Sequence, residues 1–210
     1  MGLREVKRER TRRLISDKAF ELFTDRGFGR TTVEQIAAAA EVGPSTLYRY
    51  YPTKERLVLE FVEGSLFEAL DWFREQTQLS LPDGLQGVVE RVLDQMESNP
   101  DRVRTVYELA GQTPSVSAHL ADVIWRWRDE LTAELTTRLT ADSSDQPLAG
   151  ASVAFTAALA AGITMNVIEV TVQTWVDNPA GTDAKELARE AMCLLRGGGI
   201  PLPTVDPTQL

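Results

Sequence analysis

The sequence predicts an all-α protein of about nine helices, in which a small three-helix domain precedes a larger helical domain. Three observations support this fold class. Hydrophobic residues recur at three- and four-residue spacing along most of the chain. No run of alternating β-branched residues is bounded by hairpin turns. The chain has 210 residues, 43% of them hydrophobic and 25% charged, which is enough for a real core and is ordinary for a globular protein.

The first three predicted helices are close together in the sequence. Gly27 ends the first, since glycine favours the position after a helix. Its hydrophobic face consists of Ile15, Ala19, Leu22 and Phe23. Thr31 is expected to be the N-cap of the second helix, with Glu34 three residues later completing a capping box. The turn 41–43 separates this helix from a third helix, which spans about 44–49 and begins with proline.

A long fourth helix is predicted from Lys54 to about Gln76, after the break at Pro52-Thr53. Further breaks rich in Pro, Gly and Asn leave five more helical segments. They are 84–98, 101–111, 115–140, 148–177 and 183–196. We therefore expect a domain over residues 1–53, a second domain over 54–197, and a flexible tail over 198–210, which follows Gly197 with two further glycines and contains three prolines.

The charge is unevenly distributed. The chain carries a net charge of −9, but its first 56 residues hold 12 basic and 8 acidic side chains, and the remainder has a charge of −13. A basic segment joined to an acidic one can approach DNA in only one orientation, because phosphate repels the acidic part. Such asymmetry can also arise by accident, so charge alone does not decide the point.

The remaining composition favours a cytoplasmic protein that is not in a membrane. The single cysteine, Cys193, excludes an internal disulfide and suits a reducing compartment. The N-terminus is charged and has no apolar signal region. The apolar stretch 151–176 is interrupted by Thr, Asn, Glu and Gln, so we interpret it as a buried helix of a soluble protein.

Two short helices joined by a three-residue turn and braced by a preceding helix have helix-turn-helix geometry, whose second helix enters the major groove of DNA. Leu47 should face the small core, with Val42, Ile36 and Ala40. Ser45, Thr46, Tyr48 and Arg49 then remain on or near the exposed face, where hydroxyls suit phosphates and Arg suits phosphate or guanine. Tyr50 and Lys54 could add a backbone contact and a cation. The alternative is a tyrosine-rich core packed against the acidic domain.

Residues 15–57 closely resemble the DNA-binding domain of the TetR family. The matching residues are Ile15, Ala19, Leu22, Phe23, Gly27, Phe28, Thr31, Thr32, Val33, Ile36, Ala37, Ala40, Val42, Thr46, Leu47, Tyr48, Tyr50, Lys54, Glu55 and Leu57. The resemblance covers about a quarter of the chain, and the rest is similar only in its helix count. Glu41 stands where the family often has glycine, so it is expected to hold a positive φ at some cost. Gly43 replaces a common serine N-cap.

The resemblance implies a role for each matching DNA-binding residue. Thr31 and Thr32 would anchor phosphates. Ser45, Thr46 and Arg49 would enter the groove, with Pro44 at the tip of the recognition helix. Tyr48, Tyr50 and Lys54 would clamp the DNA backbone.

The resemblance also implies that the C-terminal helices bind an effector and dimerise. An apolar stripe on the last helix and small residues on the preceding one would suit a two-fold dimer, although an intramolecular core remains the alternative. The stripe is Leu187, Ala188, Ala191, Leu194 and Leu195, and the small residues are Ala154, Ala157, Ala158, Ala161 and Gly162. Aromatic side chains suit a lipophilic effector. The candidate residues are Trp72, Tyr107, Trp125, Phe155, Asn166 and Glu169.

The candidate effector residues have other interpretations. Most of the aromatic residues could belong to the core, and because Trp125 and Trp127 are two apart they cannot share a helix face. Glu169 could meet a cationic ligand, an arginine across a dimer interface, or water.

No enzyme site is recognisable. His119 and Cys193 are the only residues of their types and are far apart in the sequence, so no zinc site, catalytic dyad or cofactor motif is expected. The sequence therefore predicts a DNA-binding regulator that acts on a pseudo-palindromic site as a homodimer, in the family's usual way a repressor released by a small lipophilic effector. The alternative is a helical small-molecule-binding or scaffold protein without sequence-specific DNA binding.

Overall fold

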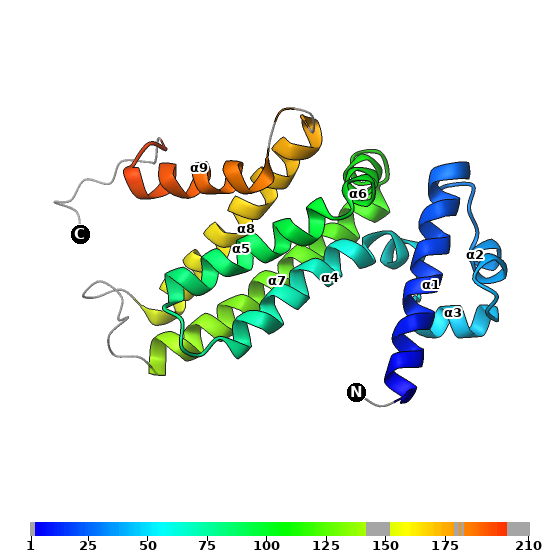
Figure 1. Cartoon of the computed structure of the whole chain (residues 1–210), viewed down its shortest axis with the longest axis horizontal. Helices are drawn as coiled ribbons and strands as arrows, with labels where there is room; N and C mark the ends of the chain where they lie inside the picture. Colours follow the sequence, from blue (N-terminus) through cyan, green and yellow to red (C-terminus); the bar gives the residue numbers. More distant parts are fainter. Residues whose placement is uncertain (1–2, 142–151, 179–180, 182, 201–210) are drawn as a thin grey trace.

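The computed structural model describes residues 3–141, 152–178, 181 and 183–200, which form nine α-helices (Figure 1). The helices are α1 (Leu3–Arg26), α2 (Val33–Ala39), α3 (Pro44–Tyr50), α4 (Lys54–Glu75), α5 (Leu81–Glu97), α6 (Pro100–Gln112), α7 (Pro114–Ala141), α8 (Val153–Asp177) and α9 (Ala184–Gly197). The described residues contain no strand, which confirms the all-α class. The start predicted at 148 and the tail beyond residue 200 lie outside the described residues.

Helices α1, α2 and α3 form one end of the molecule, which we call the head (Figure 1). Gly27 follows α1 with a φ of 83°, the left-handed conformation that ends a helix at low cost in glycine. Glu41, in the turn between α2 and α3, has a φ of 54°. This confirms the positive φ expected at this position.

The capping box of α2 lies one residue later than predicted. Thr32 is the N-cap: its side chain accepts a hydrogen bond from the Gln35 backbone N–H at 3.2 Å, and the Gln35 side chain accepts from the Thr32 backbone N–H at 3.0 Å. Both Thr31 with Glu34 and Thr32 with Gln35 satisfy the capping-box pattern. The second pair forms the capping box because the Thr31 side chain is buried against α1 and cannot cap α2.

Helices α4 to α9 form the rest of the molecule, which we call the body. Helix α4 begins at the head and packs against α5 and α7, and α7 packs along α8 (Figure 1). Trp127 on α7 is fully buried and its indole N–H donates to the Leu66 carbonyl of α4 at 2.8 Å. Trp125 is 57% exposed, which confirms that the two tryptophans lie on different faces of α7.

Helix α5 begins at Leu81, three residues before the predicted start. The segment 81–84 contains Pro and Gly and was interpreted as a break, but Pro82 lies in the first turn, where its missing N–H costs nothing. Gly84 faces the Phe73 ring, so its lack of a Cβ allows α5 to approach α4 closely.

Helix α8 is buried on one side only. Ala157 and Ala161 are fully buried within the chain, as the intramolecular alternative expects, whereas Ala154 and Ala158 are exposed. Four larger apolar residues of α8 are exposed: Phe155, Leu159, Ile163 and Val170. Among the described helices only α8 is long and apolar enough to cross a membrane, but the core helix of a soluble protein meets the same criteria.

Candidate nucleic-acid interface

Helix α3 is held against the other two helices of the head by one buried side chain. Leu47 is fully buried, and it packs in the core that includes Ile36 and Ala40 of the preceding helix and turn. This confirms the inward face predicted for α3. Gly43 is the N-cap, with Pro44 at the first helical position and no side-chain cap, so the backbone N–H groups at the start of α3 are not covered by a capping side chain.

The opposite face of α3 is exposed and chemically varied. Pro44, Ser45 and Arg49 are exposed, Tyr48 is 47% exposed, and Thr46 is half-buried. These side chains offer hydroxyl donors, a guanidinium and an aromatic ring, the groups that contact phosphates and base edges in a major groove. Tyr50 is half-buried and the Arg49 guanidinium carbon lies 5.6 Å from its ring centroid. The two side chains therefore lie against each other.

The two threonines before α2 differ in orientation. Thr31 is 1% exposed, and its hydroxyl lies within hydrogen-bond distance of two carbonyls, 2.9 Å from Gly27 O and 3.2 Å from Leu22 O. Its side chain is directed into the head, away from the position of a phosphate anchor. Thr32 is exposed. Of the two threonines expected to anchor phosphates, only Thr32 is therefore accessible from outside the head.

Lys54 is partly buried and fastens the start of α4 to the head. Its ammonium donates to the Phe28 and Thr31 carbonyls, both at 3.0 Å, and lies 4.5 Å from the centroid of the Phe28 ring. The sequence predicted a cation for DNA at this position. The structure directs two of the three ammonium donors inward, so the side chain joins the two parts of the chain.

A cluster between α1 and α4 also connects the head to the body. Arg12 pairs with Glu60 at 2.7 Å, and the buried Tyr51 hydroxyl donates to the Arg12 carbonyl at 3.3 Å. Burial, and then the nearby Glu60 charge, raise the pKa of Tyr51 above its ordinary value, so its hydroxyl remains a proton donor. Arg102 of α6 pairs with Asp17 of α1. Sequence reasoning missed this cluster because its contacts to α1 join residues 39 or more positions apart.

Two of the six candidate effector residues, Tyr107 and Glu169, lie near each other, and the six differ in burial. Trp72 is half-buried beneath the Arg91 guanidinium, 4.2 Å from the ring centroid, and Tyr107 is half-buried. Burial, and then the charge of Glu169, raise the pKa of Tyr107. Trp125, Phe155, Asn166 and Glu169 are exposed.

None of these six residues lines any of the three described cavities. These have volumes of about 560 Å³ between α1 and α4–α6, 270 Å³ between α5 and α9, and 170 Å³ among α5, α8 and α9. The smallest is mainly apolar, but it is below the size usual for small-molecule sites, about 300–1,000 Å³.

Comparison with known proteins agrees with this geometry. The sequence model of "Bacterial regulatory proteins, tetR family" matches residues 15–61, which comprise most of the head and the start of α4. The HTH-type transcriptional regulator TcmR of Streptomyces glaucescens is 48% identical over 58 residues, and the nucleoid occlusion factor SlmA of Pasteurella multocida is 28% identical over 120 residues. These matches cover 28% and 54% of this chain. They cover only 26% and 59% of the relatives themselves.

Solved structures share the fold over nearly the whole chain. FadR of Thermus thermophilus, a TetR-family transcriptional repressor in complex with lauroyl-CoA, superposes with a TM-score of 0.61 at 21% identity, covering 93% of this chain and 98% of that one. FadR of Bacillus subtilis, in complex with stearoyl-CoA, has a TM-score of 0.62 at 22% identity, covering 88% and 97%. At this level of identity the likeness establishes the fold.

Proposed function

This chain belongs to the tetR family of bacterial regulatory proteins, and on that premise we propose that it is a sequence-specific DNA-binding regulator of transcription located in the cytoplasm. The observation that carries the proposal is α3, whose single buried anchor leaves Ser45, Tyr48 and Arg49 exposed on a head with a net positive charge. The head, residues 1–53, would contact DNA. The acidic body, residues 54–197, would stay away from phosphate.

A homodimer would present two recognition helices to a pseudo-palindromic site. The exposed apolar face of α8, together with Leu194 and Leu195 of α9, supports this arrangement, because such a face is stable in water when a second copy covers it. Two copies of α3 would then lie in successive major grooves, about 34 Å apart. The distance between them would depend on the orientation of the head relative to the body.

Repression relieved by a small lipophilic effector is the regulation we propose. The support is the lauroyl-CoA and stearoyl-CoA in the two FadR structures that share this fold. The described apolar cavity, about 170 Å³, is too small for a long acyl chain, so the body helices would have to separate on binding. A ligand that prefers this separated state weakens DNA binding only as far as its preference between the two states allows.

Selection of bound sequences from random duplex DNA tests the proposal. A dimeric regulator should enrich a two-fold symmetric motif, and its affinity should fall steeply as salt is raised. Arg49→Ala should relax the preference at one base position per half-site, and Tyr48→Ala should weaken binding to all sequences about equally. Arg104→Ala, which removes a cation from α6, serves as the control and should change neither quantity.

The alternative is a helical ligand-binding or scaffold protein whose head does not read sequence. It predicts no enriched motif from a folded dimer at low salt. The nucleoid occlusion factor among the relatives favours a second candidate function, in which the head acts on the nucleoid in place of transcription. An enriched motif that lies away from promoters would favour that candidate over the regulator.

A further inference from the structure

The positive charge of the head comes from one segment near the start of α1. Positions 4–13 hold six basic and two acidic side chains, whereas positions 14–56 hold six of each. Helix α3 itself contributes a single cation, Arg49. The charge that attracts DNA phosphate is therefore concentrated on α1, outside the recognition helix.

Part of this segment, residues 3–11, projects from the head, and we call it the arm. Among the side chains of α1 that the structure describes, the first that is buried is Ile15, and Lys7, Arg8 and Arg10 are all exposed. A helical segment of this length extends about 13 Å, which is about the length of four base pairs of duplex. Burial in the core of the head therefore does not explain the arm.

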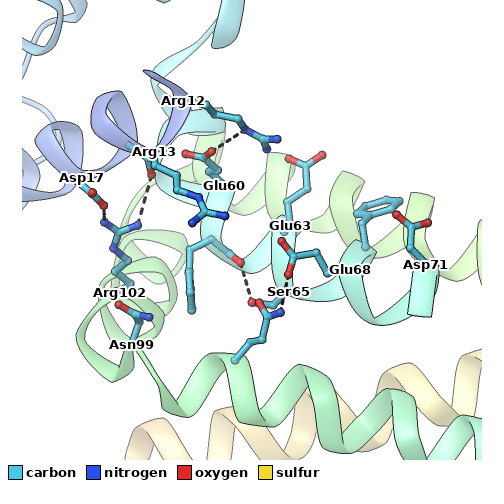
Figure 2. Close-up of a pocket in the computed structure, with 15 residues that line it drawn as sticks. Arg12, Arg13, Asp17, Glu60, Glu63, Ser65, Glu68, Asp71, Asn99 and Arg102 are labelled. Atoms are coloured by element: carbon cyan, nitrogen blue, oxygen red, sulfur yellow. Dashed lines mark hydrogen bonds and ion pairs between the residues drawn. The ribbon is translucent and has the colours of Figure 1, made fainter. Parts of the chain in front are cut away.

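The base of the arm is fixed by contacts with three other helices. Figure 2 shows Arg12 paired with Glu60 of α4, at 2.7 Å, and Arg102 of α6 paired with Asp17. Tyr51, the C-cap of α3, donates to the Arg12 carbonyl at 3.3 Å. The arm thus leaves the head beside the C-terminal end of α3, and α1 continues past α3 (Figure 1).

The cations of the arm are not neutralised within the chain. No ion pair among the described side chains includes Lys7, Arg8 or Arg10, whereas the next lysine of α1, Lys18, pairs with Glu21. Lys7 and Arg10 are three residues apart, so they are neighbours on one face of the helix, where like charges repel. A polyanion beside this face would remove the repulsion.

We propose that the arm is a second DNA contact, in which Lys7, Arg8 and Arg10 bind phosphates beside the groove that receives α3. This inference rests on the function proposed above and adds to it a surface outside the recognition helix. Pro44 and Tyr51 lie at opposite ends of α3, so the arm is far from the tip that enters the groove and reaches the backbone. Phosphates are the same in every sequence, so the arm adds affinity without sequence preference.

Fluorescence anisotropy of the whole chain with a labelled duplex, between about 0.05 and 0.2 M salt, tests the arm. The duplex carries the selected motif or, if none is enriched, a random sequence. The double variant Lys7→Gln with Arg10→Gln removes two cations per subunit, and glutamine has a similar helix propensity. Each lost phosphate contact lowers the slope of log affinity against log salt by about 0.9, so a dimer should lose about 3–4. We expect its affinity at the lower salt to fall roughly tenfold or more.

A matched double variant controls for net charge. Lys18→Gln with Arg104→Gln removes the same charge from the middle of α1 and from α6, and it should leave the salt slope unchanged. Sequence selection with the Lys7 and Arg10 variant should return the parent's motif, in contrast to Arg49→Ala. Circular dichroism of each variant checks that the helices are retained.

Three results would overturn the arm contact while the regulator proposal stands. The first is an unchanged salt slope in the Lys7 and Arg10 variant. The second is an equal loss of slope in the control variant, which would mean a general effect of charge. The third is an altered motif, which would mean that the arm contacts bases.

Failure of the proposed function gives different results. A parent that enriches no motif, but whose binding to random duplex depends on Lys7 and Arg10, keeps the arm contact and removes sequence-specific recognition. A parent that binds no duplex at low salt removes both.

Discussion

Lys54 shows how a single side chain can join two parts of a fold. Its ammonium is bonded to the carbonyls of Phe28 and Thr31, so it satisfies acceptors in the loop between α1 and α2 while fixing where α4 begins. Replacing Lys54 with methionine keeps most of the apolar stem and removes both bonds. We expect Lys54→Met to lower the free energy of unfolding by about 1–3 kcal/mol, since these bonds involve a charged donor.

Urea denaturation measures this change in Lys54→Met. Lys18→Met is the control, because Lys18 pairs only with the exposed Glu21 one turn away, and it should cost less than about 0.5 kcal/mol. If the two variants were equally stable, the bonds of Lys54 within the chain would add nothing to stability, and only the DNA-facing role predicted from the sequence would remain.

Glu41 is strained in the left-handed region, with a φ of 54°. A left-handed conformation costs a non-glycine residue about 1–2 kcal/mol, and glycine loses about 0.5–1 kcal/mol more in backbone entropy on folding. Glu41→Gly should therefore stabilise the head by about 0.5–1 kcal/mol. Glu34→Gly, the same replacement within α2, should destabilise it by about 1 kcal/mol. Thermal unfolding compares the two, and a Glu41→Gly variant less stable than the parent would show that the turn is not strained.

At the scale of the elements, the helix ends that are marked by strong local signals were predicted well. Gly27, Pro44 and Pro100 mark helix ends that the structure places within one residue of the prediction. Errors arose where two local patterns compete, as at Thr31 and Thr32, or where a proline lies inside a first turn, as at Pro82. Contacts between elements carry no local signal.

In the candidate site, too, the features that follow from local patterns were predicted and those that depend on packing between helices were not. The outward and inward faces of α3 follow from helical periodicity and were predicted correctly at Leu47 and Tyr48. The inward direction of Thr31 and the internal bonds of Lys54 depend on how α1 and α4 pack, and so does the cluster of Arg12, Glu60 and Tyr51. The burial of the effector candidates likewise depends on the packing of the body.

Helices α4 and α5 approach each other through glycine and aromatic rings. A Cβ at Gly84 would lie 2.5 Å from Cε2 of the fully buried Phe73, and one at Gly87 would overlap the ring of Trp72. Alanine normally gains about 1 kcal/mol over glycine within a helix, but here the overlap should prevail. We expect Gly84→Ala to destabilise by about 1–3 kcal/mol, and Gly87→Ala by less, because the half-buried Trp72 can move.

Gly111→Ala is the matched control for the glycine variants. Gly111 lies in α6 and has open space around it, so alanine there should stabilise the chain by up to about 1 kcal/mol. Urea denaturation of the three variants measures the contrast. Stabilisation by Gly84→Ala would mean that α4 and α5 are farther apart than the structure places them.

At the scale of the whole molecule, charge and apolar surface lie in different places. The first 56 residues are net positive and the remainder is strongly negative, whereas exposed apolar side chains gather on α8 and at the end of α9. One face can therefore bind DNA while another binds a second copy, and neither contact obstructs the other. Only in a dimer would two heads act on one DNA duplex, so DNA affinity should depend on the apolar face although that face does not touch DNA.

Leu159 lies near the middle of the exposed face of α8 and is 52% exposed, so a charge there tests the dimer. Leu159→Glu places a carboxylate in the proposed interface, where burying it without a partner is costly, and it should convert the dimer to a monomer in sedimentation velocity while leaving the helical signal intact. Leu79→Glu alters a similarly exposed leucine in the loop before α5 and should remain dimeric. If the Leu159→Glu monomer still bound a two-fold symmetric DNA site with the parent's affinity, recognition would not need the paired heads. If both variants remained dimeric, the subunits would associate through another face, and the exposed residues of α8 would require a different partner.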